Sequence, residues 1–207
     1  FTYPTPTTIG TFYTNADGYL VTPEKLPYGD GYSIVEVQAP YGYTLNAEPV
    51  YFSITQDGAS EEGGVTVVEV ERPNMAQKGV INISKTGEVF STVTEANGVY
   101  QPVYEVQGLA GAVYEVTAAE DIYTLDGTLR ASASEVVDTV TTGADGIAKT
   151  KELYLGKYDV KEITAPTGMV LNGETHSVEL VYAGQEIAVT ETATSYYNER
   201  QKVEISL

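Results

Sequence analysis

The sequence predicts an all-β protein built from two tandem β-sandwich domains, and three observations favour this fold class. The chain has 207 residues, enough for two domains of about 100 residues that each bury a core. Its apolar runs are rich in Val, Ile, Thr and Tyr, with 17 Tyr in all, and these side chains suit pleated strands. Finally, one sequence pattern occurs twice along the chain, whereas helical patterns are essentially lacking.

The repeat appears in two pairs of segments. YTNADG at 13–18 matches TTGADG at 141–146, and DGYSIVEVQAPYGY at 30–43 matches GKYDVKEITAPTG at 156–168. The order of the segments is the same in both copies. A repeat of this length indicates two copies of one domain.

The two copies end in the same motif. Asn-x-x-Gln-Lys occurs at 74–78 and at 198–202, and each occurrence leads directly into a new strand pattern. Such short joints favour a stiff array over domains on flexible linkers. We therefore expect domains at 1–76 and 77–201, with residues 202–207 starting a following domain.

Only the second domain is expected to be whole. The first begins opposite residues 129–142 of the second, so we expect its opening strands to be missing from this chain. Residues 88–107, centred on Glu95-Ala-Asn-Gly98, are interpreted as an inserted hairpin. Short strands at regular spacing favour a sandwich; in the second domain they are predicted at 79–85, 110–117, 121–125, 135–142, 147–153, 157–163, 175–182 and 186–198.

Three polar residues share the phase of the core in three separate strands. Because alternate residues of a strand lie on one face, Lys85, Glu162 and Asn198 are each predicted on the apolar face of their strand. Their apolar neighbours two positions earlier are Ile83, Val160 and Tyr196. The three polar groups are therefore expected to meet in the core.

Burial of these groups predicts a reaction. A lone buried ammonium or carboxylate costs several kcal/mol, so such groups pair or exchange a proton. Burial favours the neutral forms of amines and carboxylic acids, which leaves an amine nucleophile beside an acid. Attack of the Lys85 amine on the Asn198 side-chain carbonyl would expel ammonia and leave an isopeptide bond. Glu162 would polarise that carbonyl and shuttle protons.

Five segments of the chain carry a family resemblance: VINISK at 80–85, GLAGAVYEV at 108–116, the ADG turn, GKYDVKEITAPTG at 156–168 and YYNER at 196–200. In these segments the chain resembles the Cna B-type (prealbumin-like, Ig-related) domains of Gram-positive surface adhesins and pilins. The resemblance implies Ig-like, prealbumin-like β-sandwiches. It also implies an intramolecular isopeptide bond between Lys85 and Asn198, assisted by Glu162.

The first domain carries only part of the same set. Glu36 and Asn74 stand at the positions of the glutamate and the asparagine. The partner lysine would belong to the missing first strand, and Lys25, in a loop after Pro23, is a poor substitute. We therefore expect no bond within the first domain of this chain.

Other classes of function are disfavoured. A formal charge of −18, with 11 Lys and Arg, would repel nucleic acid and anionic membranes, and no apolar stretch is long enough to insert into a membrane. Cysteine is absent, which excludes disulfides and thiol chemistry. We predict no metal and no cofactor. His176, the only histidine, is interpreted as an ordinary surface or edge residue, because no triad can be assembled around it.

The sequence thus predicts an extracellular structural protein. We expect stalk or pilus-shaft domains of a cell-wall-attached bacterial surface protein, with other domains of that protein as partners and no catalysis beyond single-turnover bond formation. The alternative is an adhesive module in which residues 88–107 or a Tyr-rich surface binds a host extracellular matrix protein or glycan. An enzyme acting on an external substrate ranks below both.

Overall fold

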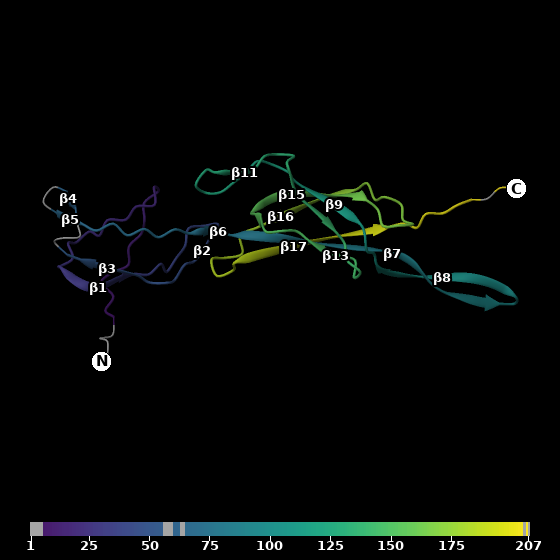
Figure 1. Ribbon diagram of the computed structural model, residues 1–207, viewed down its shortest axis with the longest axis horizontal. Coiled ribbons are helices and arrows are strands. Elements are labelled where there is room, and N and C mark those ends of the chain that lie inside the picture. The colour runs from purple at the N-terminus through teal and green to yellow at the C-terminus, as the bar shows by residue number, and fades with distance from the viewer. Residues whose placement is uncertain (1–5, 56–59, 63–64, 205, 207) are drawn as a thin grey trace. The chain divides into compact units, whose positions relative to one another are not determined.

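The computed structural model describes residues 6–55, 60–62, 65–204 and 206 (Figure 1). All regular secondary structure in these residues is strand, which confirms the all-β class. The described residues therefore contain no helix long and apolar enough to cross a membrane. The strands are β1 Gly29–Ile34, β2 Tyr43–Thr44, β3 Val50–Ile54, β4 Ser60–Glu62, β5 Val65–Val67, β6 Met75–Ala76, β7 Lys78–Ala96, β8 Val99–Gly108, β9 Val113–Ala118, β10 Ile122–Tyr123, β11 Leu129–Ala131, β12 Val136–Thr141, β13 Ile147–Lys149, β14 Leu153–Tyr154, β15 Gly156–Thr164, β16 Thr175–Leu180 and β17 Val189–Asn198.

The chain divides into two compact units. The first comprises Phe1–Val35 and Glu48–Arg72, and the second comprises Glu36–Ala47 and Pro73–Leu207. In the first unit β1 pairs antiparallel with β3, and the rings of Tyr32 and Phe52 stack with centroids 5.6 Å apart. No side chain described in the first unit is buried. This part of the chain therefore has no closed core of its own among the described residues.

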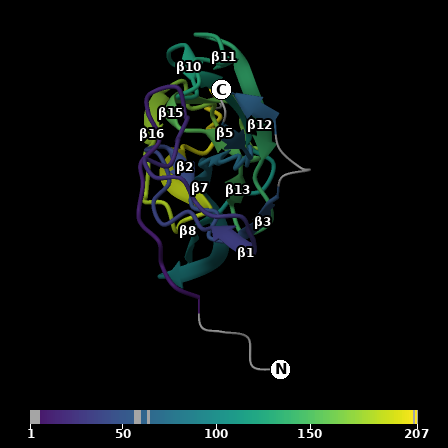
Figure 2. The same cartoon turned by 90° about the vertical axis from the view of Figure 1, so that its left-hand side faces the viewer.

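The second unit contains a sandwich of two sheets. One sheet has the order β12-β9-β15-β16, and β15 and β16 lie side by side in both views (Figures 1 and 2). In the other sheet β7 is central, with β13 and β14 antiparallel to it and β17 parallel to it. Alternating side chains of these strands enclose the apolar core, whose burial is the main favourable term in folding. The core includes Ile81, Ile83, Tyr114, Val116, Ala148, Leu153, Tyr158, Val160, Leu180 and Tyr196.

Strand β7 continues without a break from the sandwich into a hairpin with β8. The ladder runs from Thr86 opposite Gly108 to Ala96 opposite Val99. Asn97 and Gly98 turn the chain with φ of 54° and 76°, the left-handed conformation that two-residue hairpin turns require. The hairpin projects away from the two sheets of the sandwich (Figure 1).

Candidate functional site

The three polar residues predicted to meet in the core are placed by three strands from both sheets. Lys85 lies on β7 and Asn198 ends β17, whereas Glu162 lies on β15 of the facing sheet. The parallel register sets Tyr196 opposite Lys85, so Asn198 lies two residues beyond it on the same face. The side chains of the three are 0%, 1% and 0% exposed, in the order Lys85, Asn198, Glu162.

Each of the three side chains contacts the other two. The Nζ atom of Lys85 lies 3.0 Å from Oε1 of Glu162 and donates a hydrogen bond to Oδ1 of Asn198. The Nδ2 atom of Asn198 donates to both carboxylate oxygens of Glu162, at 3.0 Å each. The structure therefore brings the amine, the amide and the acid together in a closed triangle, which is buried from bulk solvent.

Aromatic side chains surround the lysine. Its Nζ atom lies 5.9 Å from the ring centroid of Tyr114 and 5.6 Å from that of Tyr196. Burial lowers the pKa of Lys85, and the hydrogen bond and charge of Glu162 oppose this shift. Burial also raises the pKa of Tyr196 to about 12. The net effect on Lys85 favours the neutral amine, which is the nucleophilic form.

A further residue, Asn172, orients the carboxylate and was not among the predicted site residues. Its backbone nitrogen donates to Oε2 of Glu162 at 2.7 Å. The first copy contains the same bond, from the nitrogen of Asn46 to Oε2 of Glu36 at 3.0 Å. Both asparagines follow their glutamate by ten residues, so this repeated spacing was the signal available in the sequence.

Glu36 and Asn74 form the same pair in the first copy. The Nδ2 atom of Asn74 donates to both oxygens of Glu36 at 2.8 Å each. Both residues are half-buried, unlike Glu162 and Asn198. No lysine of the described ranges forms an ion pair with Glu36. The structure therefore pairs two of the three groups there.

The only histidine supports the aromatic wall of the site. The His176 ring stacks on Tyr196, with centroids 4.1 Å apart, and its Nδ1 atom shares a hydrogen bond of 2.7 Å with the Thr194 hydroxyl. The Tyr196 hydroxyl in turn donates to the carbonyl of Val160 at 2.6 Å. His176 thus packs against the site through Tyr196, and it forms no hydrogen bond or ion pair with Lys85, Glu162 or Asn198.

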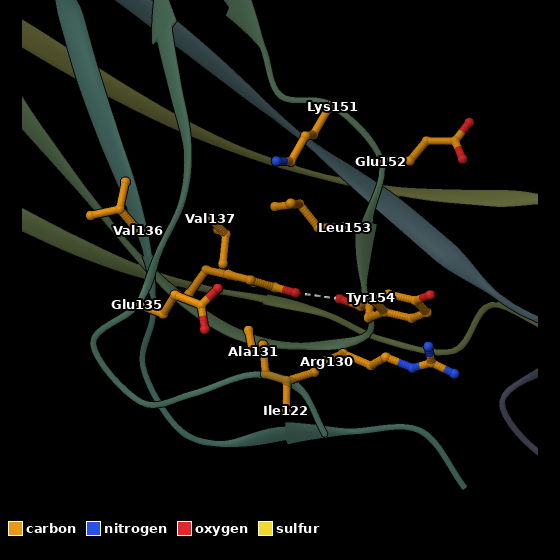
Figure 3. Close-up of a pocket in the computed structure, with 11 residues that line it drawn as sticks. Ile122, Arg130, Ala131, Glu135, Val136, Val137, Lys151, Glu152, Leu153 and Tyr154 are labelled. Carbon is orange, nitrogen blue, oxygen red and sulfur yellow. Dashed lines mark hydrogen bonds between the residues drawn. The ribbon is translucent and has the colours of Figure 1, made fainter. Parts of the chain in front are cut away.

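A hollow elsewhere in the second unit is separate from these residues. Figure 3 shows it between the β11–β12 region and the segment that contains β14. Side chains of both charges line it, including Arg130, Glu135 and Lys151, and the Arg130 guanidinium lies 4.9 Å from the Tyr154 ring centroid. Its lining contains none of the three triangle residues. Across the residues that the structure describes, no cluster of His, Asp and Glu is arranged to hold a metal ion.

Comparison with known proteins identifies relatives. The family model described as SpaA: prealbumin-like fold domain matches residues 2–74 and 103–195. The trypsin-resistant surface T6 protein of Streptococcus pyogenes serotype M6 is 32% identical over 73 residues, which are 34% of this chain and 14% of that protein. The chain therefore spans about a seventh of that relative's length.

Two solved structures are also similar to this chain. The TIE protein of Bacillus anthracis is 25% identical, with a TM-score of 0.46, over 84% of this chain and 26% of that chain. The minor pilin of Streptococcus agalactiae is 13% identical, with a TM-score of 0.40, over 79% of this chain and 73% of that chain.

Proposed function

Because this chain belongs to the family of SpaA prealbumin-like fold domains, we propose that it forms stalk or pilus-shaft domains of a cell-wall-attached bacterial surface protein, stabilised by an isopeptide bond between Lys85 and Asn198. The domains would be extracellular, and their partners would be other domains of the same protein. The observation that carries the proposal is the closed triangle of Lys85, Glu162 and Asn198, three polar groups with almost no exposure to solvent.

The bond forms by acyl transfer from nitrogen to nitrogen. The lone pair of the Lys85 Nζ atom attacks Cγ of Asn198, and the bond from Cγ to Nδ2 breaks. The Nζ atom loses one proton and Nδ2 gains one, so the products are a secondary amide and one molecule of ammonia. No oxidant, metal or second substrate is needed. Because ammonia leaves and the site is consumed, the second domain reacts only once.

Glu162 is suited to carry the proton between the two nitrogens. Its Oε1 atom lies 3.0 Å from the attacking Nζ atom and 3.0 Å from the departing Nδ2 atom. Transfer of a proton by a group within hydrogen-bond distance of both atoms is general acid–base catalysis. These contacts favour proton transfer over polarisation of the Asn198 carbonyl, since Oδ1 accepts its hydrogen bond from Lys85.

The bond would join two neighbouring parallel strands, β7 at the start of the predicted second domain and β17 at its end. The two linked residues are 113 positions apart, and by analogy with a disulfide that closes a loop of this length the link contributes about 4–5 kcal/mol. Tension that enters at Lys78 would leave at Asn198 after crossing only the first part of β7. Such a link suits a protein that holds a load at the cell surface.

Intact mass spectrometry of the denatured chain tests the proposal. The wild-type chain should be lighter than its sequence by one ammonia molecule. Glu162→Ala should restore the sequence mass, whereas the matched variant Glu36→Ala should keep the deficit, because the first copy has no lysine in its pair. A wild-type mass equal to the sequence mass would contradict the proposal.

A second candidate function is adhesion through the β7–β8 hairpin. Four of its large apolar side chains are more than half exposed: Phe90, Val99, Tyr100 and Val106. Isolated exposed apolar residues are common, but several on one hairpin are typical of a binding surface. Saturable binding to an array of host matrix proteins or glycans, lost in Tyr100→Ser, would support this function. An array without saturable binding would exclude it for the ligands tested.

A further inference from the structure

Gln77 is buried against one loop of the second unit. Its side chain is 1% exposed. The Nε2 atom donates to the carbonyl oxygens of Gly184 at 2.8 Å and Ile187 at 2.5 Å, and the Oε1 atom accepts from the nitrogen of Ala183 at 2.9 Å. All three partners belong to residues 181–188, which connect β16 to β17 and are called the receiving loop below.

The turn from Ala39 to Leu45 contacts the same loop. The nitrogen of Ala39 donates to Oε1 of Gln185 at 2.8 Å, and the nitrogen of Leu45 donates to the Gln185 carbonyl at 2.9 Å. The nitrogen of Gln77 donates to the carbonyl of Gly42 at 2.8 Å. The turn from Ala39 to Leu45 and the Gln77 side chain therefore form one surface, and the receiving loop covers it.

The second copy builds an equivalent surface. The turn from Ala165 to Leu171 corresponds to the covered turn, and Gln201 corresponds to the buried glutamine in the Asn-x-x-Gln-Lys motif. The nitrogen of Gln201 donates to the carbonyl of Gly168 at 2.9 Å. The bond from Gln77 to Gly42 is its equivalent in the first copy, and the two donor–acceptor distances differ by only 0.1 Å.

The two surfaces differ in exposure. Leu171 is 50% exposed, whereas the equivalent Leu45 is half-buried. The Gln201 side chain is exposed, whereas Gln77 is 1% exposed. The second copy thus carries a formed turn, an exposed leucine and an amide free to take up new partners. In the first copy the same elements are covered by a receiving loop.

We infer that Gln201 and the turn from Ala165 to Leu171 form a docking surface for the receiving loop of a further prealbumin-like domain. The Gln77 amide bonds only backbone atoms of its loop. Backbone groups are present in any sequence, so this glutamine recognises the shape of the loop, while the nitrogen of Ala39 also bonds one of its side chains, that of Gln185. The partner is therefore a domain with the same fold, joined directly after the glutamine. The inference does not depend on the isopeptide bond.

An extended chain tests the inference. Residues 1–201 would be followed directly by a second copy of residues 78–207, so that Gln201 precedes Lys78 as Gln77 does. Segmental isotope labelling of the added copy allows hydrogen exchange to be measured at its own Ala183 amide. This amide should be protected, and Gln201→Ala should accelerate its exchange about tenfold, because one hydrogen bond is lost.

The matched variant is Gln77→Ala in the same chain. It should accelerate exchange of the original Ala183 amide and leave the added copy unchanged. If the Ala183 amide of the added copy exchanges at the same rate in the extended chain and in its Gln201→Ala variant, the docking surface is refuted. If Gln77→Ala leaves its own Ala183 unchanged, the bond that the inference extends is refuted. The ammonia deficit of the extended chain reports separately on the isopeptide bond.

Discussion

Removal of Lys85 should change how far the protein extends under tension. In Lys85→Met the nucleophile is lost but a side chain of similar length remains in the core. The wild-type link would shield the segment between Lys85 and Asn198 from force, so only residues 78–85 of the sandwich would bear it. In the variant, force would reach the whole sandwich and unfold it.

The extra extension follows from the length of the shielded segment. The linked residues are 113 positions apart, and an extended chain spans about 3.3–3.6 Å per residue. Unfolding of Lys85→Met should therefore release about 390 Å that the wild-type chain retains. Single-molecule force spectroscopy with handles at both ends measures this length directly.

Two further variants make this result specific. Asn198→Ala removes the electrophile and should give the same added length as Lys85→Met. Lys161→Ala, an exposed lysine of β15, should extend like the wild type. A wild-type chain that releases this length under forces that unfold Lys85→Met would refute the mechanical role of the link.

Three more outcomes are expected. In Asn198→Ala no bond can form, and burial keeps the pKa of Lys85 below its unfolded value of 10.5. Between the two pKa values the native state binds fewer protons than the unfolded state, so the free energy of unfolding, measured by urea titration, should rise with pH. The double variant Lys85→Met/Asn198→Ala should lack this rise. Gly146→Ala should lower the free energy of unfolding by roughly 1–3 kcal/mol, and with it the melting temperature, because Gly146 has φ of +79° and a Cβ there would lie 2.4 Å from the Lys85 carbonyl oxygen. The control Gly173→Ala, which has open space around it, should have little effect. Tyr196→Phe loses one hydrogen bond, to the Val160 carbonyl, and should lower stability by about 1 kcal/mol while the ammonia deficit stays unchanged.

The phase of the polar residues was predictable because a strand repeats every two residues. Lys85, Glu162 and Asn198 each follow an apolar residue by two positions, and burial of one face then fixes where they point. Their mutual distances depend on the stacking of two sheets and on the parallel pairing of β7 with β17. No local sequence pattern specifies such pairing, so the distances within the triangle had to be taken from the structure.

The segment at 147–153 shows where a side chain overrides the strand pattern. The sequence predicts one strand there, but the structure has β13 and β14 with a break between them. The Thr150 hydroxyl accepts a hydrogen bond from the nitrogen of Ile81 at 3.0 Å, and Asp138 accepts one from the nitrogen of Lys151 at 2.8 Å. Side-chain bonds to the backbone thus replace part of the ladder.

The continuity of β7 was also missed at the sequence level. The first strand was predicted at 79–85, with the inserted hairpin at 88–107 as an addition after it. In the structure a Cβ at Gly87 would lie 2.7 Å from the Leu109 side chain and 2.8 Å from the Asn198 carbonyl oxygen. Glycine is therefore required by a close approach, and the strand continues through it.

Peptide mapping tests the isopeptide bond most directly. Trypsin digestion under denaturing conditions cleaves after free lysine and arginine, so a linked Lys85 would resist cleavage. The bond predicts that residues 79–130 and 162–200 elute as one branched species, lighter by one ammonia molecule than the two peptides together. Separate peptides 79–85, 86–130 and 162–200 at their sequence masses would show that Lys85 and Asn198 are not joined.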